Sequence, residues 1–185
     1  ATSNTTITHT ISPSVKYKTK SSLNLNLTGN IMIMNYNDNL FIATDGSMTN
    51  TDFKTSSYTG SMGLKFSFPL TINIGSGLSI NQPNDPLSTK TEFLVLSSKI
   101  GYKFLKNKLR SYLGFNLVAG NKLANSDGQG AINNTKTTIK SGIQYKLSDK
   151  MNLGITVNYI TLNDIIEETN NFSEIKSKIK ISYRF

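Results

Sequence analysis

The feature that most constrains this chain is a two-residue alternation of apolar and polar side chains that recurs over long segments. Residues 174–185 read EIKSKIKISYRF, with isoleucine and aromatic residues in one row and mostly lysine in the other. Because successive side chains of a β-strand point to opposite faces, this pattern predicts a strand with one apolar and one polar face. Residues 137–147 and 151–161 repeat the pattern.

Six further segments with the same alternation precede these three, and no helical periodicity competes with them. They lie at about residues 6–19, 23–36, 57–69, 71–81, 93–105 and 109–120. The segments are longer than the ~5 to 6 residues usual for strands of soluble sheets. They match the ~9 to 11 residues that a tilted strand needs to cross a bilayer, with some extension beyond it. The sequence therefore predicts an all-β protein of long antiparallel strands.

The connections between the predicted strands alternate between tight and long. The tight ones are residues 21–22, 69–70, 106–108 and 148–150. The long ones, rich in Asn, Asp, Ser, Thr and Gly, lie at about residues 37–56, 82–90, 121–134 and 162–172. Turns of this composition join antiparallel neighbours. We therefore expect an up-and-down sheet with short turns at one end and long loops at the other.

Aromatic residues recur just before the tight turns, in a weak internal repeat. They are Tyr17, Phe66, Phe68, Tyr102, Phe104, Tyr145, Tyr183 and Phe185. Amphipathic rings favour a membrane–water boundary, so this spacing predicts an aromatic girdle at the turn end. The alternative is that Tyr and Phe are simply good strand formers.

Composition excludes several classes of protein. Hydrophobic residues make up 37% of the chain and the mean hydropathy is -0.26. No apolar run approaches the ~18 residues of a membrane helix, which excludes a helical membrane protein. A membrane β-barrel passes this test because polar residues alternate with its lipid-facing ones. The chain has no cysteine, which excludes disulfides, thiolate metal sites and a cysteine nucleophile.

The C-terminal strand resembles the assembly signal of bacterial outer-membrane β-barrel proteins. That signal ends in two aromatic residues spaced by one, with a polar residue upstream, and Lys178, Tyr183 and Phe185 fit it. Lys180 stands where the family prefers glycine. The hairpin at residues 142–159 looks like the strand–turn–strand units of porin-like barrels. The resemblance implies a bacterial outer-membrane location, with membrane lipid and the barrel-assembly machinery as partners, and it identifies no substrate.

We therefore predict a single domain over residues 1–185, an antiparallel up-and-down transmembrane β-barrel of about 8–10 strands. The aromatic ends orient the first strand toward a tight turn, which leaves an odd number of strands. Bacterial single-chain barrels normally have an even number. A further strand at residues 39–44, a lost N-terminal segment, or closure with another chain would each resolve this. We favour the C-terminal part of a larger or multi-chain barrel, or a barrel whose N-terminus is exposed at the surface.

The sequence offers little catalytic or metal-binding chemistry. His9 is the only histidine and falls on the apolar row of the first predicted strand. A hydrolase would need partners for it that the sequence does not provide. Asp164, Glu167 and Glu168 share one loop, and neighbouring loop acids are more often solvated than bound to calcium. We expect no catalytic residue, no cofactor and no metal, and so no enzyme.

The distribution of charge is more informative. The net charge is +9, and basic residues occupy the polar row of most predicted strands. The residues predicted to face the lumen are Lys65, Lys99, Lys103, Arg110, Lys136, Lys140, Lys146, Lys176, Lys178 and Lys180. Most acidic residues lie in the long loops. Because the basic residues do not cluster with stacking aromatics, we do not expect nucleic acid to bind.

Three functions are compatible with this pattern. The first is a passive, anion-preferring pore or plugged channel with a cationic lumen, which would be nearly filled by side chains if it closed with about nine strands. The second is a structural anchor or assembly component whose loops or open edge contact other envelope proteins. The third is a soluble β-protein of a surface fibre, in which the apolar row would face inward.

Overall fold

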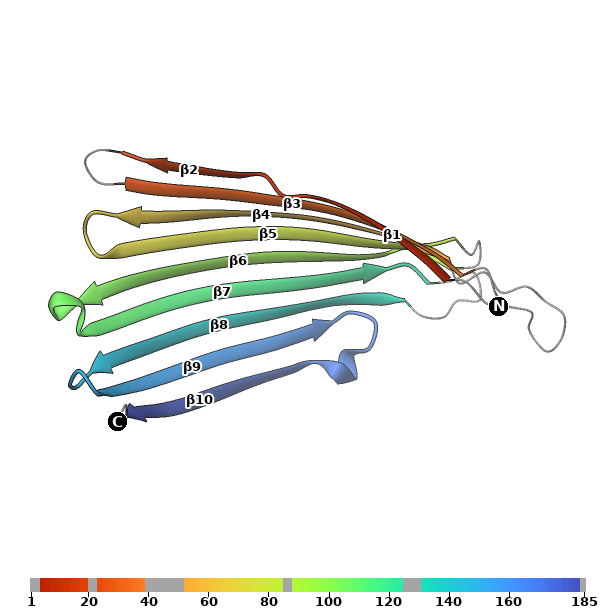
Figure 1. The fold of residues 1–185 in the computed structure, drawn as a ribbon. Coiled ribbons are helices and arrows are strands. Elements are labelled where there is room, and N and C mark those ends of the chain that lie inside the picture. Colours follow the sequence, from red (N-terminus) through yellow and green to blue (C-terminus); the bar gives the residue numbers. More distant parts are fainter. Residues whose placement is uncertain (1–3, 20–22, 39–51, 85–87, 125–130, 184–185) are drawn as a thin grey trace, which may run out of the picture.

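The computed structural model describes residues 4–19, 23–38, 52–84, 88–124 and 131–183, and it forms one antiparallel sheet (Figure 1). The strands follow one another in the order β1-β3-β4-β5-β6-β7-β8-β9-β10, with β2 also paired to β3. Their bounds are β1 (Asn4–Ile11), β2 (Ser14–Lys18), β3 (Leu23–Asp38), β4 (Phe53–Phe66), β5 (Leu70–Pro83), β6 (Thr91–Phe104), β7 (Leu109–Lys122), β8 (Ile132–Lys146), β9 (Met151–Asp164) and β10 (Phe172–Tyr183). The predicted all-β, up-and-down fold is confirmed.

The first predicted strand is interrupted, which the alternation alone did not reveal. β1 and β2 pair with successive parts of β3 and are separated by Ser12 and Pro13. Proline has no backbone N–H to donate to a ladder, so it breaks the pairing at this point. The carbonyl of Pro13 still accepts a hydrogen bond from Gly29 N at 2.9 Å. The two strands therefore form one pass across the sheet.

The tight turns lie together at one end of the sheet (Figure 1). The β6–β7 turn contains the 3₁₀ segment η1 (Leu105–Asn107), whose three residues have φ of 49°, 53° and 71°. The backbone of Lys146 donates to the Lys108 carbonyl at 2.8 Å, which ties this turn to β8. At the β8–β9 turn, Met151 N donates to Ser148 Oγ at 3.1 Å. The predicted turn at residues 21–22 lies outside the described residues.

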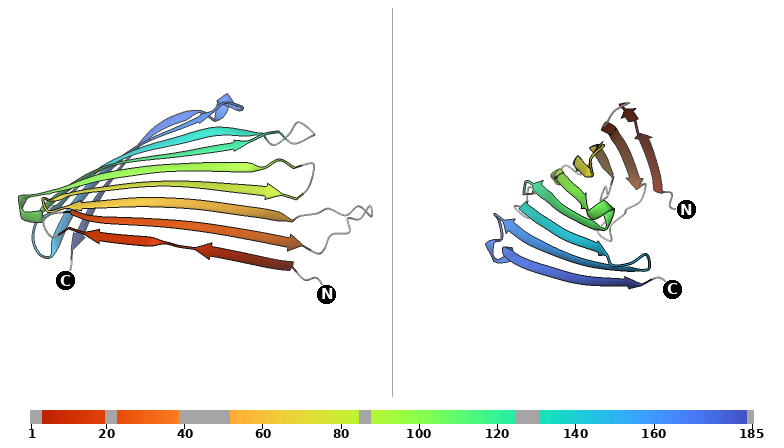
Figure 2. Two further views of the ribbon diagram at one scale, coloured as in Figure 1. Left: turned by 90° about the horizontal axis from the view of Figure 1, so that it is seen from above. Right: turned by 90° about the vertical axis from the view of Figure 1, so that its left-hand side faces the viewer.

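The sheet is a single curved layer, open along one side (Figure 2). The described residues include no buried hydrophobic side chain, and Ile175 and Ile179 are 71% and 69% exposed. A soluble sheet needs a second layer over such a face. Neither η1 nor η2 (Glu168–Asn170) is long or apolar enough to cross a membrane, and the described residues contain no α-helix.

The two edges of the sheet run in the same direction. Among the described residues, β1 and β2 pair only with β3, and β10 pairs only with β9. The sheet has nine passes, counting both edges, so both edge strands run from the loop end to the turn end. If they met directly, they would pair in parallel rather than antiparallel. The predicted additional strand at residues 39–44 lies outside the described residues, and closure of the barrel remains a prediction.

Candidate functional site

The strand register places all ten residues of the predicted cationic lumen on one face of the sheet, which we call the basic face. One cross-strand row shows the arrangement, since directly paired residues share a face. It runs Lys176, Asn158, Lys140, Gly114, Lys99, Asn73, Gly63, Asn26 and Lys16. A second row contains Lys180, Gly154, Gln144, Arg110 and Lys103. Distant parts of the sequence thus contribute charge to one surface.

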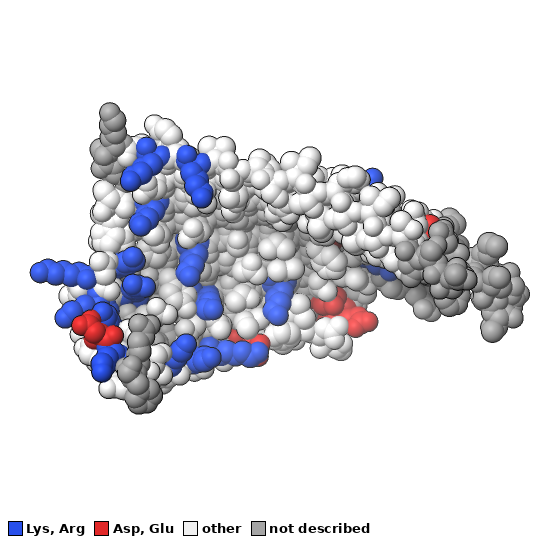
Figure 3. Space-filling view, in the orientation of Figure 1, with Lys and Arg blue, Asp and Glu red and all other residues white. Residues whose placement is uncertain are grey.

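The basic face is the hollowed side of the sheet. Figure 3 shows lysine and arginine side chains spread over the concave surface, with most of them toward the turn end. The opposite, convex face carries the other row of each strand, which we call the apolar face. On β10, for example, it presents Ile175, Ile179 and Ile181, each more than 60% exposed.

Like charges on the basic face are spaced apart. In the row of Lys140, the neighbouring cations Lys99 and Lys176 stand two strands away on either side, with glycine or asparagine between. Adjacent strands lie ~4.8 Å apart, so this spacing keeps the row's cations about 10 Å from one another along the sheet. Across the described strands Lys103 and Arg110 are the exception, because they face each other directly, and along β10 Lys176, Lys178 and Lys180 share the face at every second residue. Like charges in that position repel.

Few carboxylates neutralise the basic face. Lys176 pairs with Glu174 at 2.6 Å, and Lys146 pairs with Asp149 at 2.6 Å. The other eight basic residues form no ion pair within the described part of the chain. The hydrogen bond from Lys146 holds the pKa of the Asp149 carboxyl, in the β8–β9 turn, below its usual value. The face therefore keeps a strong excess of positive charge.

Tyr112 is a feature of the basic face that the sequence reading missed. Its ring lies over Gly142 on the next strand, where an added Cβ would approach ring atoms to 2.5 Å. The Tyr112 hydroxyl is 3.3 Å from the Thr156 hydroxyl, and Lys99 Nζ is 4.6 Å from the ring centre. A glycine and an aromatic residue on the polar rows of adjacent strands were the available signal. The contact links β6, β7, β8 and β9.

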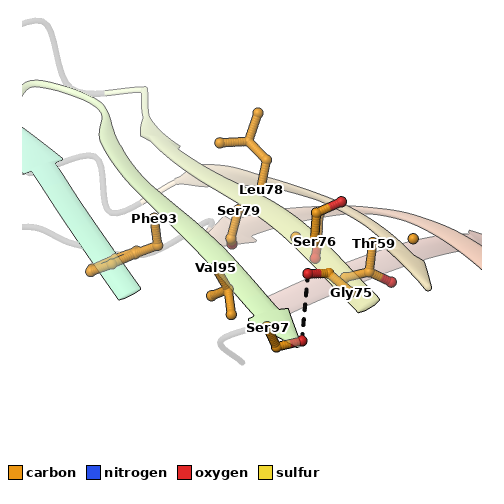
Figure 4. Close-up of a pocket in the computed structure, with 11 residues that line it drawn as sticks. Thr59, Gly75, Ser76, Leu78, Ser79, Phe93, Val95 and Ser97 are labelled. Atoms are coloured by element: carbon orange, nitrogen blue, oxygen red, sulfur yellow. Dashed lines mark hydrogen bonds between the residues drawn. The ribbon is translucent and has the colours of Figure 1, made fainter. Parts of the chain in front are cut away.

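A hollow of about 280 Å³ lies among β4, β5 and β6 (Figure 4). Glycine, serine and threonine line most of it, together with Leu78, Phe93 and Val95. Ser97 Oγ donates to the Gly75 carbonyl at 3.4 Å. No titratable side chain lines this hollow, so it offers no acid, base or charged ligand group.

The candidates for catalysis and metal binding, His9 and the acidic residues of one loop, lie in surroundings that give them no catalytic or metal-binding partner in the part of the chain that the structure describes. His9 pairs with Ile33 on the apolar face, between Ile7 and Ile11 in its row, as predicted. Asp164 Oδ1 accepts backbone hydrogen bonds from Ile166 and Glu167, each at 3.0 Å. Within the described residues, no group of three or more metal-ligating side chains comes together.

The described aromatic residues of the predicted girdle lie at the turn end. Phe66 stacks on Phe68 with ring centres 5.1 Å apart, and Tyr102 contacts Phe104 at 4.4 Å. Tyr183, of the predicted assembly signal, is 56% exposed on the apolar face opposite Met151. Phe185, the other residue of that signal, lies outside the described residues.

These features define the wall of a membrane β-barrel: one curved sheet, an apolar convex face, a polar concave face and tight turns at one end. The family model for the outer membrane protein beta-barrel domain matches residues 4–185, and the chain belongs to this family. The family indicates a location in the bacterial outer membrane, as predicted. Searches of curated proteins and of solved structures gave no match.

Proposed function

We propose that this protein is a non-enzymatic outer-membrane barrel whose basic face lines a water-filled or plugged lumen that prefers anions. The observation that carries the proposal is the placement of ten basic side chains on the concave face, eight of them without an ion-pair partner among the described residues. A surface of one sign raises the local concentration of ions of the opposite sign. Rings of basic side chains select anions in pores for this reason.

The division between the faces supports the same proposal. The apolar face would contact lipid hydrocarbon, and the exposed isoleucines of β10 need such a cover. The basic face cannot take that position, because a lysine or arginine on the lipid side costs ~2 to 4 kcal/mol at the bilayer centre. Water or bound anions must therefore meet the lysines. Membrane lipid and the barrel-assembly machinery are the partners that this proposal requires.

Planar-bilayer recording under a salt gradient tests the pore. We expect a small conductance with a reversal potential on the anion-selective side. Lys140→Glu should shift that potential toward cations, because residue 140 lies on the basic face about midway along β8. Lys54→Glu is the matched control, since Lys54 lies on the opposite face, paired with Asn35 and Gln82. No conductance, or equal shifts from both variants, would contradict the pore.

The open edges favour a second candidate, a structural anchor or assembly component. Within the described residues, β10 has a strand neighbour on one side only. An unpaired edge in lipid leaves backbone groups without hydrogen bonds, so another strand must cover it. A photo-crosslinking residue at Ser177 of β10 tests what that strand is. Crosslinks to another envelope protein support the anchor, whereas crosslinks only to β1 or β2 of the same chain contradict it.

A further inference from the structure

A basic pocket lies at the turn end of the sheet, over β7, β8, β9 and β10. It has a volume of about 760 Å³, within the range of small-ligand sites. The cationic side chains that line it are Lys108, Arg110, Lys146, Lys150, Lys178 and Lys180. Asp149 is the one carboxylate among its lining residues. Figure 3 shows this crowding of basic side chains around a small acidic group at the lower turn end.

The pocket is built by strand register and by two turns. Lys180, Gly154, Gln144 and Arg110 form one row across its floor, and Gly154 leaves space between the two cations. Lys178 stands one row further into the sheet, opposite Thr156. The backbone bond from Lys146 to Lys108 holds the β6–β7 turn against β8. Six cations from three strands and two turns therefore surround one space.

Among the residues that the structure describes, the positive charges of the pocket are compensated by a carboxylate only at Lys146. Asp149 is already bound to Lys146 at 2.6 Å, so it leaves the remaining five cations unpaired within the described residues. Arg110 also faces Lys103 directly across β6 and β7. Bringing like charges together costs free energy that a bound anion would recover. The pocket should therefore attract an anion that carries several negative charges. The rest of the basic face, where the cations are further apart, should attract such an anion less strongly.

We propose that this pocket binds a compact multivalent phosphate anion. Phosphate oxygens accept charge-assisted hydrogen bonds from lysine and arginine, and arginine can donate two in parallel. Gln144, Asn152 and Ser182 line the same space and add neutral donors. The ligand is either a soluble polyphosphate or the phosphate of an anionic lipid headgroup. The proposal rests on the proposed function, because the pocket opens on the face assigned to the lumen.

Calorimetric titration of the full chain, folded in a phosphate-free zwitterionic detergent, with inorganic tripolyphosphate tests the site. We expect saturable binding of one ligand per chain. Arg110→Gln and Lys180→Gln should each weaken it by roughly tenfold, since each removes a charge-assisted hydrogen bond. Lys65→Gln is the matched control on the same face outside the pocket, and it should change the affinity by less than about twofold.

Competition separates the two sources of phosphate. Short-chain phosphatidic acid that displaces tripolyphosphate at comparable concentration identifies a lipid headgroup, and tripolyphosphate binding without such displacement identifies a soluble anion. Absence of saturable binding, or equal losses in pocket and control variants, overturns the pocket. An anion-selective conductance that persists without tripolyphosphate binding leaves the proposed function standing. If the chain binds tripolyphosphate but does not conduct, the proposed pore is contradicted and the proposed binding pocket is supported.

Discussion

The two faces of the sheet are made from the same strands, yet their chemistry is opposite. In β8, Ile139, Ile143 and Tyr145 lie on the apolar face, and Lys140 and Lys146 lie on the basic face. The difference arises from the two-residue period of the strand, so a shift of register by one residue would exchange the faces. A barrel wall works because one face meets hydrocarbon and the other meets water. Each face should therefore respond differently to the same substitution.

The largest difference in stability between the two faces is expected when a charge is placed about midway along a strand. Ile139→Arg would put a cation on the apolar face and should destabilise folding in lipid vesicles by about 2 to 4 kcal/mol. Thr138→Arg, one residue away on the basic face, should cost less than about 1 kcal/mol, because water reaches that side. Urea titration followed by heat-modifiable gel migration measures both. Equal costs would show that the two faces meet the same environment.

A smaller effect is expected where the basic face is packed. Gly142→Ala should destabilise the fold by about 1 to 3 kcal/mol, because the new Cβ would displace the Tyr112 ring from its hydroxyl and lysine contacts. Gly154→Ala is the control on the adjacent strand, since its Cβ would come no closer than 3.7 Å to Gln144. That change should be neutral or stabilising by about 0.5 kcal/mol. The same unfolding assay distinguishes them, and equal losses would refute specific packing at Gly142.

The hydroxyl contact on this face should contribute less than the ring. Tyr112→Phe removes the contact with Thr156 but keeps the ring over Gly142, and should cost about 0.5 to 1 kcal/mol. Combining it with Thr156→Val in a double-mutant cycle isolates the pairwise contribution. Strictly additive losses would mean that the two hydroxyls do not interact.

The smallest effect is expected at the exposed β8–β9 turn, outside both faces. Lys146 lowers the pKa of Asp149, so the carboxylate stabilises the folded state at neutral pH and loses this effect as acid protonates it. Wild type should exceed Asp149→Asn in stability at pH ~7, and the difference should vanish near pH ~2. Unfolding midpoints at the two pH values measure it. If the difference in stability grew in acid instead, the pKa of Asp149 would be raised rather than lowered in the folded protein.

Much of the architecture was predictable because alternation shows which residues form a strand and which face each side chain occupies, and the tight turns show which strands are neighbours. Residues 137–147 and 151–161 were predicted as strands, and β8 and β9 contain nearly all of them and extend further toward the loops. The break at Pro13 was missed because the apolar row continues from Ile11 to Val15 on either side of it. Alternation carries no information about what covers an edge strand, so closure could not be decided from it.

The site was predictable only in part. The sequence assigned Lys178, Lys180 and Arg110 to the polar row, and the register places them on one face. The pocket also uses Lys108 and Lys150, which lie in turns where no period applies. Their positions depend on turn geometry and on the backbone bond between the β6–β7 turn and β8. Such contacts arise from the fold rather than from local pattern.

A single-cysteine scan along β8 tests the division of the two faces most directly. Because the sequence contains no cysteine, each variant would carry only the one that is introduced. Cysteines placed one at a time at residues 137–141 would carry a fluorophore, with quenching by brominated lipid compared against quenching by iodide in water. We expect lipid quenching at 137, 139 and 141, and iodide quenching at 138 and 140. Quenching without this alternation, or with the two rows exchanged, would contradict a barrel wall whose concave basic face meets water.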